Sequence, residues 1–163
     1  MKQIVFIRHG KASHEQSFAK DIERPLIEKG IERTKKISKY LSDNNIIPDL
    51  IISSNAIRAF ETAKFIAHTF NYNEKNIKVF DSLYGCNTEE YLNLIHSISN
   101  KINTLFVFGH NPEISECFSL FSGQHQLPLP TSGTAIFSSV SKKWSEIHPK
   151  NTKLIKLLIP KEI

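Results

Sequence analysis

The chain contains little cysteine and no long apolar run. Its two cysteines, Cys86 and Cys117, belong to no Cys-x-x-Cys pair and to no spacing typical of metal ligands. We therefore expect two reduced thiols in a cytosolic protein. No apolar run approaches the length of a membrane span, and residues 1–3 lead directly into the first apolar stretch, which leaves no room for a secretory signal. These features predict a cytoplasmic protein with no membrane partner.

The sequence also lacks the signatures of nucleic-acid binding. The net charge of +5 and the pI near 9.2 fit either a nucleic-acid binder or an enzyme for anionic substrates. The lysines at 29, 35, 36 and 39 share one predicted helix with Glu28 and Glu32, which is typical of a solvated face. Neither an RRM-like aromatic pattern nor a zinc-finger spacing is present. We therefore expect no nucleic-acid partner, and the positive charge is better explained by an enzyme that acts on an anionic substrate.

Three short apolar runs each end in residues suited to bind or attack a phosphate. Residues 4–7 precede Arg8-His9-Gly10, residues 50–52 precede two serines and Arg58, and residues 105–108 precede Gly109-His110-Asn111. Unbroken runs of Ile, Val, Leu and Phe are typical of parallel strands buried on both faces. Ligands of open α/β sheets bind beyond the carboxyl ends of such strands. The sequence thus predicts that two arginines and two histidines gather at one edge of a sheet.

The rest of the chain alternates strands and helices without a repeat or linker, so we expect a single domain over residues 1–163. A polar loop over residues 11–23 follows the first strand. The clearest helical period lies between residues 56 and 70, with Asn55 as its expected N-cap. The remaining expected elements are helices from Pro25 to about 43, from about 88 to 99 and after Pro112, and strands at about 77–80, 132–140 and 153–159.

The four gathered side chains suit phosphoryl transfer. Arginine offers a planar fork of donors that matches two phosphate oxygens, a role for Arg8 and Arg58. Histidine can attack phosphorus, and His9 is the better nucleophile because Gly10 lets the backbone approach closely. His110 is the better donor to an equatorial oxygen, and we expect it to act in its protonated form. A single histidine at a strand end is more often structural, and a single arginine in a first helical turn is usually solvated. Two histidines and two arginines at three strand ends instead favour a site.

The chain resembles the histidine phosphatase superfamily, which has the phosphoglycerate mutase-like fold. The resemblance rests on motifs that occur in this order: Arg8-His9-Gly10, Ser53-Ser54, Arg58-Ala59, Glu61-Thr62-Ala63 and Gly109-His110-Asn111-Pro112. Within the superfamily, the short length and the segment Asp21-Ile22-Glu23-Arg24-Pro25-Leu26 are similar to the small phosphohistidine phosphatases of SixA type. The resemblance covers nearly the whole chain.

This resemblance implies a three-layer α/β/α sandwich with a mostly parallel sheet of about six strands. It implies that His9 is phosphorylated during the cycle and that Arg8, Arg58 and His110 form the phosphate pocket, with no metal or cofactor. Gly10 lies beside the nucleophile, and two further residues, Ser13 and Arg24, are expected to line the site. Lys11 is interpreted as a solvated loop residue rather than a phosphate ligand, and Asp21 and Glu23 as part of a turn before Pro25.

One departure from the family bears on the substrate. Larger members carry a carboxylic general acid on the segment that here reads Ser82-Leu83-Tyr84-Gly85, and Asp81 is only close in sequence. A leaving imidazole needs less protonation than an alkoxide, so phosphohistidine in a protein, such as a histidine phosphotransfer domain or phosphocarrier, is the favoured substrate. The alternatives are a phosphatase of a small soluble phosphoester and, less favoured, a catalytically silent phosphate-binding module.

Overall fold

The computed structural model describes residues 1–125 and 128–163, and in these residues six strands form one sheet. The spatial order is β3-β2-β4-β1-β5-β6. Only β5 runs against the others, since it is antiparallel to both β1 and β6. The mostly parallel sheet is therefore confirmed. The strand bounds are β1 Lys2–Arg8, β2 Leu50–Ser54, β3 Lys78–Phe80, β4 Thr104–Gly109, β5 Thr134–Ser139 and β6 Thr152–Leu158.

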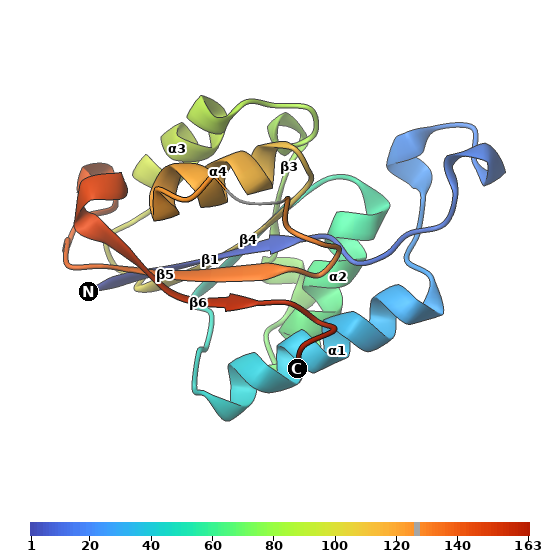
Figure 1. Ribbon diagram of the computed structural model, residues 1–163, viewed down its shortest axis with the longest axis horizontal. Coiled ribbons are helices and arrows are strands. Elements are labelled where there is room, and N and C mark those ends of the chain that lie inside the picture. The colour runs from blue at the N-terminus through green and yellow to red at the C-terminus, as the bar shows by residue number, and fades with distance from the viewer. Residues whose placement is uncertain (126–127) are drawn as a thin grey trace.

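Four α-helices of the described chain cover the two faces of this sheet. Helices α1 and α2 lie on one face and α3 and α4 on the other, which gives the expected three layers (Figure 1). Their bounds are α1 Glu28–Asp43, α2 Ile57–Thr69, α3 Thr88–His96 and α4 Glu113–Ser122. None of the helices within the described ranges is long and apolar enough to cross a bilayer.

The apolar runs of β1, β2 and β4 are continuous because these central strands are buried on both faces. In β1, Ile4 and Phe6 pack toward α3 and α4, whereas Val5 and Ile7 pack toward α1 and α2. The same alternation continues in β4. Successive side chains of a strand point to opposite faces, so covering both faces with helices requires an apolar residue at every position.

Helix α2 begins one residue later than the sequence indicated. Its buried stripe, Ala59, Ala63, Ile66 and Ala67, follows the predicted period. The prediction of Asn55 as N-cap was wrong, because Ala56 occupies that position and caps the helix without a side-chain hydrogen bond. Propensity favoured asparagine, but the packing of the alanine stripe against the sheet sets where this helix starts.

The register of the central strands brings the phosphate-binding motifs together. Arg8 at the end of β1 pairs with Gly109 at the end of β4, and Ser53 of β2 pairs with Phe108 of β4. The residues that follow, His9 and His110, therefore leave the sheet at the same edge. Two short 3-10 helices border this edge from other parts of the chain: η2, Asp21–Glu23, and η4, Asp81–Leu83.

Candidate functional site

His9 is held in one tautomer by its two neighbours. Its Nδ1 lies 2.7 Å from the carbonyl oxygen of Gly10, and its Nε2 lies 3.2 Å from Nε of Arg58. A carbonyl oxygen only accepts and a guanidinium only donates, so Nδ1 carries the proton and Nε2 presents a lone pair. Burial lowers the pKa of His9 to about 3, and only 8% of the residue is exposed. The neutral ring is thus a nucleophile at Nε2.

Arg58 connects the nucleophile to the loop that follows β1. While Nε donates to His9, Nη1 donates to the backbone oxygen of Asp21 at 2.7 Å and Nη2 to its Oδ2 at 2.8 Å. The arginine is 6% exposed. Three contacts in one plane fix the guanidinium, so the alternative of a solvated first-turn arginine does not apply.

His110 lies beside His9, with ring centroids 5.1 Å apart. Its Nε2 is 2.8 Å from Oγ of Ser54, which also accepts the backbone N–H of Ala56 at 3.2 Å. Its Nδ1 is buried and has no protein partner. Burial and then the positive charge of Arg58 lower the pKa of His110 to about 4. The expected protonated donor is therefore neutral in this state, because a cation is disfavoured next to buried arginine.

Arg8 supplies a second buried donor without a partner. Its Nη1 donates to the carbonyl oxygen of Leu129 at 2.8 Å, while its Nε is buried and forms no hydrogen bond. Burial and the nearby Arg58 lower the pKa of Arg8. Unsatisfied buried donors cost free energy, and an anion is the partner that Nε of Arg8 and Nδ1 of His110 both suit.

Asp21 is the functional residue that the sequence reasoning missed. Its carboxylate accepts from Arg58 as described, from Nη1 of Arg24 at 2.7 Å and from the hydroxyl of Tyr84 at 2.6 Å. Although burial would raise the pKa of the Asp21 carboxyl, hydrogen bonds from Tyr84 and the two arginines lower it. The interpretation of this residue as a simple turn former was incomplete. The only signal in the sequence was a carboxylate three residues before an arginine.

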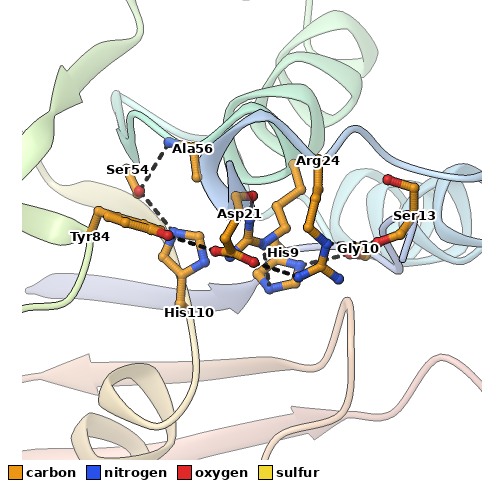
Figure 2. Close-up of polar contacts among 10 residues, drawn as sticks. His9, Gly10, Ser13, Asp21, Arg24, Ser54, Ala56, Tyr84 and His110 are labelled. Atoms are coloured by element: carbon orange, nitrogen blue, oxygen red, sulfur yellow. Dashed lines mark hydrogen bonds and ion pairs between the residues drawn. The ribbon is translucent and has the colours of Figure 1, made fainter. Parts of the chain in front are cut away.

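Arg24 and Ser13, the other residues predicted to line the site, contact each other beside Asp21. Arg24 reaches the site through Asp21, and its Nε donates to the backbone oxygen of Ser13 at 2.7 Å. The Ser13 hydroxyl is buried and without a partner. Lys11 is exposed. Figure 2 shows Arg24 and Ser13 on one side of Asp21, with Tyr84 and His110 on the other.

Gly10 is required by helix packing more directly than by a ligand. A Cβ at this position would lie 3.0 Å from Oγ1 of Thr34 and 3.2 Å from the carbonyl oxygen of Gly30, both in α1. Its backbone N–H donates to Oγ1 of Thr62 in α2 at 2.9 Å. The glycine therefore lets the turn after β1 approach α1, and that turn presents the carbonyl that binds Nδ1 of His9.

The segment that carries a general acid in larger relatives presents a tyrosine here. Tyr84 places its ring edge-on to His110, with centroids 5.5 Å apart, and its hydroxyl on Asp21 (Figure 2). Asp81 is exposed. The hydrogen bond to Asp21 raises the pKa of Tyr84. Within residues 1–125 and 128–163, no three His, Cys, Asp or Glu side chains gather in a way that would hold a metal ion.

Comparisons with known proteins identify a family and several relatives. The model of the histidine phosphatase superfamily (branch 1) matches residues 4–104. An uncharacterized chloroplastic protein of Arabidopsis thaliana is 29% identical over 98% of this chain and 78% of its own, and an uncharacterized protein of Mycobacterium tuberculosis is 26% identical over 95% and 100%.

Two solved structures have the same fold. A protein from Agrobacterium tumefaciens assigned as phosphohistidine phosphatase SixA superposes with a TM-score of 0.82 at 26% identity, covering 98% of both chains. The protein histidine phosphatase SixA in complex with tungstate superposes with a TM-score of 0.81 at 18% identity, again over 98% of both chains. On this fold and this family match, the chain belongs to the histidine phosphatase superfamily.

Proposed function

We propose that the protein is a metal-independent phosphatase that removes the phosphoryl group from phosphohistidine in another protein, such as a histidine phosphotransfer domain or a phosphocarrier. Membership of the histidine phosphatase superfamily supports phosphatase activity. The observation that carries the proposal is the buried pair His9 and His110, one with an unprotonated Nε2 that accepts from Arg58 and the other with an unpartnered Nδ1. This pair suits one tetrahedral phosphoryl group.

In the proposed reaction, the lone pair of His9 Nε2 attacks phosphorus and the bond to the substrate nitrogen breaks. The proton on Nδ1 stays hydrogen-bonded to Gly10, so that carbonyl stabilises the positive ring that forms. Arg8 and Arg58 neutralise the equatorial oxygens. Ser54, by donating to Nε2 of neutral His110, leaves the His110 proton on Nδ1, where it can bind the third oxygen. Water then attacks the phosphorylated His9, and the electron pair returns to Nε2 as phosphate leaves.

The choice of phosphohistidine rests on the leaving group. A phosphate ester releases an alkoxide that needs a proton, and the segment around Tyr84 offers no carboxylic acid for this purpose. A small soluble phosphomonoester is the alternative substrate. Phosphatases of small phosphoesters share this fold, among them a mycobacterial glucosyl-3-phosphoglycerate phosphatase with a TM-score of 0.64 at 12% identity. A silent phosphate-binding module is less favoured, because binding alone needs no positioned lone pair on His9.

A turnover panel tests the proposal. We would measure kcat/KM for a phosphohistidine protein, p-nitrophenyl phosphate and a series of alkyl and sugar phosphates. Without a general acid, alkyl phosphates should react about two to four orders of magnitude more slowly than phosphohistidine. A flat dependence on leaving-group pKa, with sugar phosphates as good as the aryl ester, would favour the small-molecule alternative. Tight phosphate binding without turnover of any substrate would favour the binding module.

A further inference from the structure

The partly exposed Asp21 carboxylate accepts three hydrogen bonds from side chains of the described residues. Its two oxygens accept from Nη1 of Arg24, Nη2 of Arg58 and the hydroxyl of Tyr84, all within 2.8 Å. These partners favour the ionised form, because the two guanidinium groups can only donate and the Tyr84 hydroxyl also donates to the carboxylate. The side chain remains 35% exposed. Asp21 is therefore a fixed negative charge that solvent, or a substrate, can reach.

Arg58 connects the attacking nitrogen of His9 to the Asp21 carboxylate. His9 and His110 are 8% and 5% exposed, so they form the floor of the site. In-line displacement puts the leaving nitrogen or oxygen opposite Nε2 of His9, and the Asp21 side chain, at 35% exposed, is more open to solvent than either histidine. The guanidinium of Arg58 bridges the two residues, because its Nε contacts Nε2 of His9 and its Nη2 contacts the Asp21 carboxylate. Tyr84, which packs on His110, holds Asp21 from the other side (Figure 2).

A fixed carboxylate at this place discriminates between leaving groups by their charge. It cannot give a proton to an alkoxide, so it does not assist the breaking of an ester bond as a general acid would. A phosphohistidine ring behaves differently. Its P–N bond breaks to a neutral imidazole only if the other ring nitrogen carries a proton, and the reacting ring is then a cation with an N–H donor. A carboxylate attracts that cation and accepts its hydrogen bond.

We propose that Asp21 is a specificity-determining residue that binds the protonated imidazole ring of a phosphohistidine substrate. This inference rests on the proposed function and narrows its substrate to the ring protonated on the nitrogen away from phosphorus. In the step, the Nε2 lone pair of His9 forms the new P–N bond, and the electron pair of the old P–N bond goes to the substrate nitrogen. The substrate ring keeps its other proton, hydrogen-bonded to Asp21, and departs as neutral imidazole.

Asp21→Asn tests this role, because it removes the charge and keeps an acceptor oxygen for Arg58. The probes are phosphohistidine in a short peptide and p-nitrophenyl phosphate, whose leaving group is an anion. Asp21→Asn should lower kcat/KM for the peptide by about tenfold to a hundredfold more than it lowers kcat/KM for the aryl ester. Glu61→Gln is the matched control. Glu61 accepts from the backbone N–H of Leu26 at 2.7 Å, outside the phosphate pocket. Glu61→Gln should therefore leave the ratio of kcat/KM for the peptide to kcat/KM for the aryl ester unchanged.

Two other results would overturn the inference, and they differ in what they say of the proposed function. Equal losses for both substrates in Asp21→Asn would mean that Asp21 only positions Arg58, and the phosphohistidine phosphatase proposal would stand. A wild-type enzyme that hydrolyses the aryl ester but not the peptide or a phosphohistidine protein would overturn both. A circular dichroism melt of each variant shows that a loss does not come from unfolding.

Discussion

Arg58 donates its Nε–H to Nε2 of His9 over 3.2 Å, so the arginine expected to bind phosphate rests on the nucleophile itself. This contact and the Gly10 carbonyl fix the neutral tautomer of His9 before any substrate arrives. The guanidinium must pass its hydrogen bond from Nε2 to a phosphate oxygen when the phosphoryl group enters. We therefore expect activity to depend on both His9 and Arg58.

Substituting His9 should abolish the covalent intermediate. When the enzyme is quenched during turnover, one histidine should carry a phosphate that is labile to acid and stable to base, and His9→Ala should lose both this label and measurable turnover. The measurement is mass spectrometry of alkaline-quenched protein. The control is His68→Ala, which removes an exposed histidine of α2 and should keep the label. Phosphate on Ser13 or Cys86, or full activity in His9→Ala, would refute the assignment.

Replacing Arg58 with lysine keeps a positive charge but loses the fork of donors. One ammonium cannot contact His9, the Asp21 carboxylate and the Asp21 backbone together, so transition-state stabilisation should fall by about 2 kcal/mol or more. Steady-state kcat/KM for p-nitrophenyl phosphate measures this loss. Arg33→Lys, a matched change in α1 away from the site, should have little effect. Near-normal activity in Arg58→Lys would show that charge alone is sufficient.

The stability of the protein should fall between pH 7 and pH 5. The pKa values of His9 and His110 drop from 6.5 in their ordinary state to about 3 and about 4 in the fold. Between these values the unfolded chain binds more protons, so stability is complete above pH 6.5 and is lost as the pH falls toward the folded values. Each histidine should contribute about 2 kcal/mol to the loss over this interval.

Urea denaturation at both pH values measures that loss. His9→Ala should reduce the difference between pH 7 and pH 5 by the contribution of one histidine, and His68→Ala should retain the whole difference. An aspartate ordinarily titrates near 3.8, so this interval avoids most of the contribution of Asp21. A pH dependence that is unchanged in His9→Ala would mean that this ring titrates normally in the folded protein.

Activity should survive exhaustive chelation. The proposed chemistry neutralises the phosphate oxygens with Arg8 and Arg58, so a metal ion has no step to perform. Turnover of p-nitrophenyl phosphate after dialysis against EDTA, followed by addition of zinc or magnesium, measures this. Activity that disappears on chelation and returns with either metal would contradict the arginine mechanism.

The local sequence was sufficient for the strands and for the motifs at their ends. Apolar runs such as residues 4–7 predicted strands buried on both faces, because only a covered parallel sheet needs an apolar residue at every position. The rule that ligands bind beyond the carboxyl ends of such strands then placed His9, Arg58 and His110 at one edge. Helix boundaries were predicted less accurately. Asn55 was expected to cap α2, but the N-cap is Ala56, because the start of this helix depends on packing against the sheet.

Only the tertiary structure decided the protonation of the histidines and the role of Asp21. The neutral state of His110 follows from its burial beside Arg58, and no local pattern contains either cause. Asp21 contacts Arg58, which is 37 positions away along the chain, and Tyr84, which is 63 positions away. The apolar runs and the residue types at their ends thus predicted where the candidate site lies, whereas long-range packing of the loop after β1 brought the Asp21 carboxylate to Arg58 and Tyr84.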